Sequence, residues 1–238
     1  MATFVLVHGA MHGGWCWRDV RTELAVRGHL VVAPTLSSQG DRRGQGIDGV
    51  GVATHVQDVV DAIWFEDLVD VHLVLHSYAG VLAGPVLERS PGRIASLTYL
   101  GAFVVDPGQS LLDVEPFAVA ERYRALAADG GLRLPAQASF LDQWGMTDPA
   151  LRDRVAPRLT DFPVRCQTDT VEFDPAPLAA VRTAYVRHTD PPLASLDRFH
   201  ERAVAEGWRV EDVATGHDMM LVAPRETADL IERIALGT

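Results

Sequence analysis

Ser77 occupies a setting that suits nucleophilic catalysis. It follows an apolar run, residues 71–75, that is typical of a buried strand. It begins a segment rich in small residues, 77–89, that is typical of a helix. A serine in such a strand-to-helix turn is arranged as a nucleophile elbow, in which the tight turn lifts the hydroxyl clear of the sheet. The helix that follows directs free N–H groups at a developing oxyanion. We therefore predict that Ser77 attacks a carbonyl carbon.

The residues beside Ser77 depart from the usual Gly-x-Ser-x-Gly pattern. Leu75 and Ala79 stand where that pattern has glycine. Small residues are favoured at both positions because the flanking backbone is crowded, so Ala79 is a mild change and Leu75 a larger one. This segment alone leaves open a serine that only caps a helix.

His217 lies where the general base of such a site is expected. It stands in the loop between the last expected strand, residues 208–213, and the last expected helix, residues 224–235. In elbow-type hydrolases the nucleophile, the acid and the histidine follow one another in this chain order. We predict that His217 takes the hydroxyl proton of Ser77.

A carboxylate is expected to hold the imidazole tautomer of the base and to stabilise the imidazolium. Asp190, after the expected strand 181–188, is the first candidate because the acid follows the penultimate strand. Asp106, after the expected strand 94–103, is the second. Asp218, Asp197 or no acid at all are the remaining alternatives.

The loop after the first expected strand is suited to binding an oxyanion. His8-Gly9-Ala10 closes that strand, and two further glycines follow at positions 13 and 14. Glycine lets the backbone approach a substrate closely, and this loop supplies one oxyanion N–H in elbow-type hydrolases. We predict that the backbone N–H groups of Ala10 and Tyr78 hold the oxyanion, while His8 braces the loop by hydrogen bonding.

The elements that position these residues alternate between strand-like and helix-like segments, which predicts an α/β fold with a mostly parallel sheet flanked by helices. Between residues 107 and 180 the alternation breaks, and helical patterns occur with no obvious strand. We expect a single domain over residues 1–238 with an inserted helical cap over 107–180. The expected strands are 4–8, 30–33, 71–75, 94–103, 181–188 and 208–213. The expected helices are 15–27, one beginning near Thr54, 77–89, 193–206 and 224–235 in the core, with 110–128 and 149–159 in the cap.

The composition is that of an acidic globular chain. It has 238 residues, a formal net charge of −11 and 47% hydrophobic residues. The negative charge argues against nucleic acid as a partner, because phosphate binding depends on Lys and Arg. No Cys/His cluster has metal-ligand spacing, and Cys16 and Cys166 are expected to be small buried hydrophobes.

Targeting signals and cofactor motifs are not recognisable. No signal-peptide pattern opens the chain, and no apolar run reaches the roughly 20 residues that span a bilayer. We expect a cytoplasmic protein without a membrane partner, with no metal and no organic cofactor, acting on a small molecule. A homodimer is left open.

Several segments resemble the branch of the α/β hydrolases that contains the plant methylesterases and hydroxynitrile lyases. The salicylate-binding methylesterases and related bacterial esterases belong to it. The similar segments, spread over the whole chain, are 8–17, 28–36, 76–78, 102–103 and 216–220. The resemblance implies the α/β-hydrolase fold, with a cap that covers the substrate pocket.

The resemblance also separates two activities. Hydroxynitrile lyases of this branch have Thr at the position of Ala10, and a Lys that handles cyanide just after the catalytic histidine. Asp218 stands in that second position and cannot supply a positive charge, so ester hydrolysis is favoured. The branch places its acid a residue or so beyond a Thr, and the match here is Thr189-Asp190-Pro191.

A carboxylesterase-like serine hydrolase acting on a small hydrophobic or aromatic ester is the function that these features favour. A lactone or a polyketide-like metabolite is an alternative substrate. A lyase, decarboxylase or cyclase at the same site stays open because Leu75 could reshape the elbow, and a small-molecule receptor without turnover is a second alternative. The residues expected to line the pocket are His12, Leu36, Tyr78, Phe103, Phe117, Phe140, Trp144 and Met219.

Overall fold

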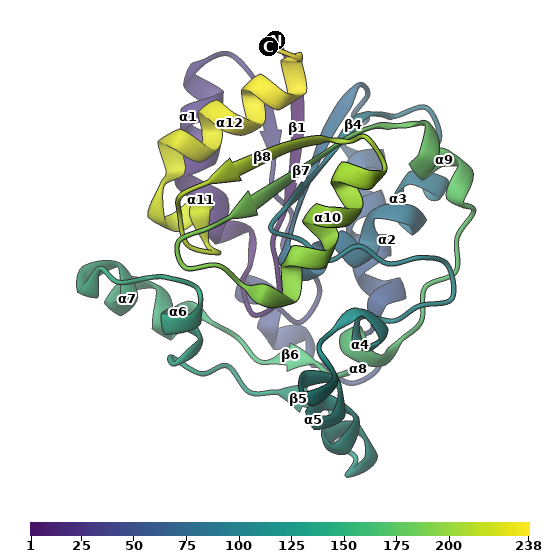
Figure 1. Ribbon diagram of the computed structural model, residues 1–238, viewed down its shortest axis with the longest axis vertical. Coiled ribbons are helices and arrows are strands. Elements are labelled where there is room, and N and C mark those ends of the chain that lie inside the picture. Colours follow the sequence, from purple (N-terminus) through teal and green to yellow (C-terminus); the bar gives the residue numbers. More distant parts are fainter.

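A six-stranded, entirely parallel sheet forms the centre of the protein (Figure 1). The computed structural model describes the whole chain, Met1–Thr238. The strand order is β2-β1-β3-β4-β7-β8. These strands are β1 (Thr3–Val7), β2 (Leu30–Val32), β3 (Val71–His76), β4 (Ile94–Leu100), β7 (Arg182–His188) and β8 (Arg209–Val213).

Apolar layers cover both faces of this sheet. In β1, Val5 and Val7 point into one layer, whereas Phe4 and Leu6 point into the other, as the two-residue repeat of a strand requires. The prediction of a parallel sheet flanked by helices is confirmed. The first layer is covered by α2 (Val52–Phe65), α3 (Ala83–Arg89) and α10 (Asp197–Ala205), and the second by α1 (Arg18–Val26) and α12 (Pro224–Leu236).

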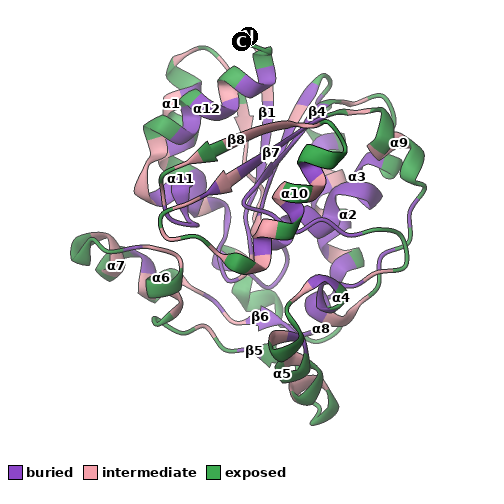
Figure 2. Cartoon of the chain, viewed as in Figure 1, coloured by how far each residue is buried: buried purple, intermediate pink, exposed green.

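The segment between β4 and β7 contains short elements that lie away from the two chain termini (Figure 1). Its helices α5, α7 and α9 are mostly exposed, in contrast to the buried sheet, whereas most of α4 is buried (Figure 2). We call residues 107–180 the cap segment; its boundaries as a unit stay a prediction. It contains α4 (Leu111–Val114), α5 (Phe117–Ala128), α6 (Phe140–Gln143), α7 (Pro149–Val155), α8 (Arg165–Thr168), α9 (Pro175–Ala180), β5 (Arg133–Leu134) and β6 (Phe162–Pro163).

Two details of the cap segment differ from the sequence-based expectation. The expected helix 110–128 is divided into α4 and α5 at Pro116, because proline lacks the N–H that an interior helical residue donates. No strand was expected here, yet β5 and β6 form an antiparallel pair. Strands of two residues are too short to produce an alternating pattern in the sequence.

The core also contains elements that the sequence pattern merged or missed. The expected strand 94–103 ends at Leu100, where Gly101 adopts a φ of +52° and turns the chain. A short helix after His217 was not expected.

No helix is both long and apolar enough to cross a membrane. The remaining elements are α11 (Met219–Val222) and short 3₁₀ helices at Gly14–Trp17, Gly40–Gln45, Ser77–Leu82, Ala156–Arg158 and Ala194–Leu196.

Candidate active site

Ser77 lies directly after β3 in a strained turn. Its φ of +54° falls in the left-handed region, which costs a residue with a side chain roughly 1–2 kcal/mol. The backbone carbonyl of Ser77 accepts a hydrogen bond from the Phe103 N–H at 3.1 Å, which ties the turn to the chain beyond β4. This conformation is that of a nucleophile elbow, and it leaves the serine only partly buried.

The glycines that make close contacts around the elbow are Gly9 and Gly80, and they do not occupy the two glycine positions of the motif. Leu75 and Ala79 are fully buried in the apolar layer. A Cβ on Gly9 would instead lie 2.8 Å from the Cβ of Ser77, and a Cβ on Gly80 would overlap the carbonyl oxygen of Phe103. Leu75 therefore packs in the core and leaves the turn intact.

His217 faces Ser77 from the loop between β8 and α11. Its Nε2 lies 3.0 Å from the Ser77 Oγ, so the ring can accept the hydroxyl proton. The His217 N–H donates to the carbonyl of Trp144 in the cap segment at 2.9 Å, and the absent side chain of Gly216 permits this approach. Burial, followed by the positive charges that His76, His188 and His12 would carry, places the pKa of His217 well below its usual value.

No aspartate that the sequence suggested as the acid contacts His217. Its Nδ1 is buried and has no hydrogen-bond partner. Asp190 is exposed. Its backbone N–H donates a hydrogen bond to the carbonyl of Thr215, just beyond β8, at 3.0 Å. The carboxylate is not brought to the base. The structure therefore does not support Asp190, the first candidate, as the acid.

The alternative acids lie elsewhere. Asp106 pairs with Arg202 at 2.7 Å, and Asp197 lies 3.8 Å from Arg187. Asp218 follows His217 in sequence and is fully buried, but its carboxylate makes no hydrogen bond to His217 and lies 3.3 Å from the Nε2 of His12. The end of β7 instead presents His188 to the base, with ring centroids 4.8 Å apart.

The loop after β1 places Ala10 beside Ser77, where both line the same pocket. The Met11 N–H donates to the Gln39 side chain at 3.0 Å, whereas the Ala10 N–H has no partner within the protein. His8 braces this loop as expected. Its Nε2 accepts from the Leu36 N–H at 3.0 Å, so its Nδ1–H donates to the carbonyl of Gly9 at 2.8 Å.

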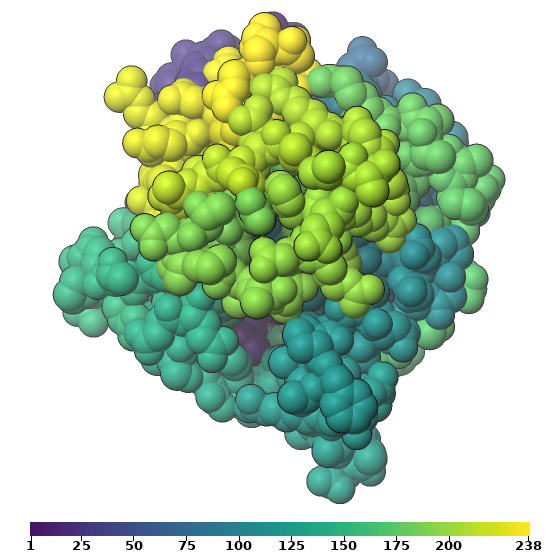
Figure 3. Space-filling view, viewed as in Figure 1, coloured from purple at the N-terminus to yellow at the C-terminus, as the bar shows by residue number.

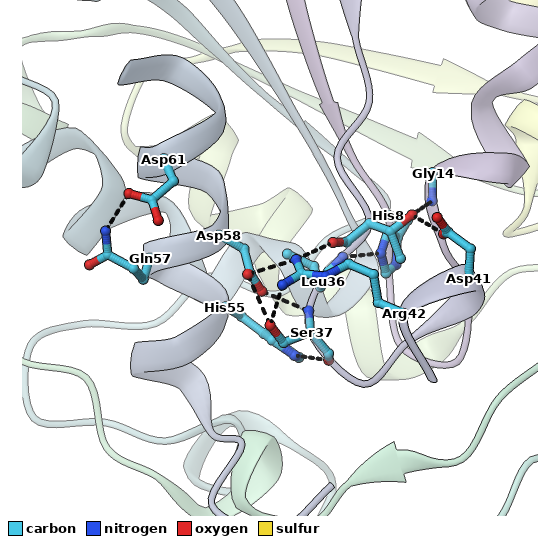
Figure 4. A network of polar contacts seen from close by, with 11 residues as sticks. His8, Gly14, Leu36, Ser37, Asp41, Arg42, His55, Gln57, Asp58 and Asp61 are labelled. Carbon is cyan, nitrogen blue, oxygen red and sulfur yellow. Dashed lines mark hydrogen bonds and ion pairs between the residues drawn. The ribbon is translucent and has the colours of Figure 1, made fainter. Parts of the chain in front are cut away.

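A polar network behind the pocket holds the loop after β2 (Figure 4). Asp58 of α2 accepts from the Ser37 N–H at 2.7 Å and pairs with Arg42 at 2.8 Å. His55 donates to the carbonyl of Ser37, so its Nδ1 accepts from the Tyr78 hydroxyl at 3.0 Å. Helix α2 thus anchors the residue that follows the nucleophile.

His12 and Asp218 form a buried ion pair next to the site, with Nε2 and Oδ2 3.3 Å apart. The His12 Nδ1 also faces the carbonyl of Ala10 at 2.8 Å, so both ring nitrogens face acceptors. Burial lowers the pKa of His12, but the Asp218 carboxylate more than offsets this effect and the pKa is raised. This arrangement favours a cationic His12 behind the loop after β1 that contains Ala10, which we call the oxyanion loop. The sequence did not indicate this role.

The pocket that opens on Ser77 lies between the sheet and the cap segment and has a volume of about 400 Å³. Figure 3 shows a hollow between these parts, with N-terminal residues at its floor. Thirteen of its 20 lining residues are hydrophobic, so it suits a mainly apolar ligand. The polar lining residues include Glu115, whose pKa burial raises to about 7, and Gln167, a buried amide with an unpaired Oε1.

Tyr78, Phe103, Phe140 and Trp144 line this pocket, as the sequence suggested. The other four predicted lining residues do not. Phe117 is 77% exposed because α5 turns it outward. Leu36 and Met219 are buried in the core, and His12 pairs with Asp218 behind the pocket wall.

Two further features bear on alternative sites. A hollow of about 490 Å³ at the amino ends of β4 and β7 is far from Ser77, whereas ligands of such sheets bind at the carboxyl ends of strands. His76, His217 and Asp218 offer ligand atoms within 4.8 Å of one another. His217 is already directed at Ser77, and His76 faces the His217 carbonyl at 3.1 Å, so we assign no metal to them.

Comparison with known proteins agrees with this geometry. The model of the alpha/beta hydrolase family matches residues 4–230, so the chain belongs to the α/β hydrolase family. A carbendazim hydrolyzing esterase from Nocardioides sp. (strain SG-4G) is 35% identical over 251 residues, covering both chains completely. Methyl jasmonate esterase 1 from Vitis vinifera is 35% identical over 114 residues, 47% of this chain and 43% of the relative. The chain is therefore a serine hydrolase of the esterase type.

Solved structures agree in fold. An extracellular alpha/beta-hydrolase from a Paenibacillus species has a TM-score of 0.85 at 22% identity and covers 98% of this chain and 99% of its own. Tomato methylketone synthase I has a TM-score of 0.81 at 19% identity, with coverage of 99% and 98%. At these identities the similarity establishes the fold alone.

Proposed function

We propose that this enzyme hydrolyses small, mostly apolar esters by an acyl-enzyme mechanism in which Ser77 is the nucleophile and His217 the general base. The observation that carries the proposal is the 3.0 Å contact between the Ser77 Oγ and the His217 Nε2 at the floor of an apolar pocket. The free N–H of Ala10 beside this pair supports it.

In the first half-reaction, His217 takes the proton of Ser77 as the Oγ attacks the ester carbonyl carbon. The N–H groups of Ala10 and Tyr78 stabilise the oxyanion. The tetrahedral adduct collapses, the bond to the alcohol oxygen breaks, and His217 returns the proton to that oxygen. In the second half, His217 deprotonates a water that attacks the acyl carbon, and Ser77 leaves with the proton.

The pocket points to the substrate class. Its volume of about 400 Å³ and largely hydrophobic lining suit a compact acyl or aromatic group. The name of one relative, a methyl jasmonate esterase, agrees with a methyl ester. Methyl esters of aromatic acids are therefore the substrates that we propose to test first.

The lyase, decarboxylase and cyclase alternatives depended on Leu75 distorting the elbow. Leu75 is fully buried in the apolar layer, and Ser77 keeps its left-handed turn. No other feature of the site favours these reactions over ester hydrolysis. A receptor without turnover would leave Ser77 unreactive, so the same experiment distinguishes it from an esterase.

Replacement of the nucleophile tests the proposed function. We expect Ser77→Ala to reduce the kcat for a p-nitrophenyl ester or an aromatic methyl ester by about 10⁴-fold or more. It should also abolish covalent labelling by a fluorophosphonate probe. Ser90→Ala serves as the matched control, because Ser90 is buried beyond α3 and away from the pocket. Equal turnover by the parent and Ser77→Ala would exclude this mechanism.

A further inference from the structure

The buried Nδ1 of His217 needs an acceptor if the proposed mechanism is to operate. For the Nε2 to accept the Ser77 proton, the neutral ring must carry its hydrogen on Nδ1. That atom has no hydrogen-bond partner in the protein, and an unpaired buried N–H is unfavourable. Asp190, the candidate expected from the sequence, is exposed and does not supply the acceptor.

His188 is the side chain that occupies this side of the base. It is the last residue of β7, is 1% exposed, and has its ring centroid 4.8 Å from that of His217, with 60° between the planes. Both of its ring nitrogens are buried and unpaired. His217 therefore lacks an acceptor for its Nδ1–H, and His188 has a ring nitrogen that could accept this hydrogen bond in the same buried region.

Gly101 provides the space that the two rings share. A Cβ at this position would lie 3.0 Å from the Nδ1 of His188 and 3.4 Å from the Nδ1 of His217. The absent side chain thus leaves both nitrogens facing the same point. Catalytic hydrogen bonds are often long or poorly aligned in unliganded structures and tighten when substrate binds.

We propose that His188 replaces the triad acid, accepting a hydrogen bond from the Nδ1–H of His217. The inference rests on the proposed esterase function, since it concerns the base of that reaction. His188 is a positioning residue: it touches neither substrate nor Ser77. It holds the His217 tautomer that leaves the Nε2 lone pair directed at the nucleophile.

This substitution of an imidazole for a carboxylate has an electrostatic consequence. Burial, opposed by the weaker effects of Asp218 and Asp197, lowers the pKa of His188 to about 4. A neutral His188 orients His217 without adding a negative charge to stabilise the imidazolium. The histidines that face His217 are His76 from β3, His12 from the oxyanion loop and His188 itself. The buried Asp218 carboxylate also lies within 4.8 Å of a His217 ring nitrogen, without a hydrogen bond to it.

Four substitutions test this role in the full-length enzyme. We expect His188→Ala to reduce kcat about tenfold or more with little change in KM, because it removes the acceptor. His188→Gln retains an acceptor oxygen at similar reach and should recover part of that loss. His188→Glu has the same shape as His188→Gln but adds a charge, so it should move the acidic limb of the kcat/KM profile to higher pH. Asp190→Asn should stay within about twofold of the parent, since an exposed carboxylate does not orient the base.

A spectroscopic measurement makes the result independent of turnover. Proton NMR of the wild-type protein should show a downfield imidazole N–H resonance that is lost in His217→Ala and His188→Ala but retained in Asp190→Asn. Circular dichroism establishes that each variant is folded, and His188→Gln and His188→Glu carry the test if His188→Ala does not fold. An unchanged kcat and resonance in His188→Ala would overturn the proposal, as would an equal loss in Asp190→Asn. If the wild type cleaves no ester, the esterase proposal fails, while the resonance still tests the contact.

Discussion

The proposed general base, His217, is surrounded by other histidines. The rings of His76 and His188 lie 4.7 and 4.8 Å from the His217 ring, centroid to centroid. Burial and these neighbours lower the pKa of His217, which keeps the Nε2 lone pair available at neutral pH. A base of low pKa is intrinsically weaker.

Glu115 gives a residue-scale prediction about pH. Burial raises the pKa of its carboxyl from 4.5 to about 7, so the folded state holds a proton that the unfolded state has lost across this interval. Stability should therefore fall as pH rises from about 4.5 through about 7. We expect Glu115→Gln to remove this fall, so that its Tm exceeds that of the parent increasingly between pH 5 and pH 8.

The control for this experiment is Glu88→Gln, which changes an exposed glutamate without an ion pair. Its Tm should follow the parent across the same pH range. A Tm difference between Glu115→Gln and the parent that does not vary with pH would show that burial of the charge is not what the substitution relieves.

At the scale of elements, close approaches of backbone position the catalytic loops. Gly9 lets the oxyanion loop pass the elbow, and Gly216 lets the base-bearing loop reach Trp144. The resulting hydrogen bond from the His217 N–H to the Trp144 carbonyl, 2.9 Å, links the loop after β8 to the cap segment. The cap segment thus helps to place the base as well as to form the pocket.

Replacement of Gly216 tests this linkage. The new Cβ in Gly216→Ala would overlap the Trp144 carbonyl oxygen, so either the loop or the cap segment must shift. We expect a loss of about 1–3 kcal/mol in unfolding free energy, measured by urea denaturation, together with a lower kcat. Gly44→Ala is the matched control because nothing lies within 4 Å of its added Cβ. Parent-like kcat and stability in Gly216→Ala would show that the approach is not required.

At the scale of the whole molecule, the protein joins a buried sheet to a more exposed cap segment (Figure 2). The central strands are buried on both faces, whereas α5 buries only Ala120. The pocket lies between these two parts. Its shape therefore depends on how the cap segment rests on the sheet.

Native-state hydrogen exchange should distinguish the two parts. Amides of β1, β3 and β4 should exchange most slowly, and those of α5 and α6 much faster, because opening the latter exposes few apolar contacts. Mass spectrometry of peptic fragments measures this contrast. Equal protection across residues 107–180 and the central strands would mean that the cap segment opens only with the whole fold and is no separate unit.

Much of the fold was predictable from local patterns. The six expected strands overlap the six parallel strands. Inner strands such as β1 and β3 were recognisable because a strand buried on both faces is continuously hydrophobic, whereas the edge strand β8 contains three charged residues. The cap segment was less predictable because β5 and β6 have two residues each, too few to show a period. Pro116, by contrast, was a local signal that could have divided the expected helix 110–128.

The residues of the site divide in the same way. Ser77 and His217 could be nominated from sequence because their chemistry depends on local settings, a strand-to-helix turn and a loop after the last strand, and the fold brings them to 3.0 Å. The partner of His217 could not be nominated from the sequence, because it depends on which side chain at the end of β7 points inward. The sequence suggested Asp190, whereas the tertiary structure leaves that carboxylate exposed and turns His188 toward the base. Residue type and order alone determined the class of chemistry, and only packing decided what surrounds the base.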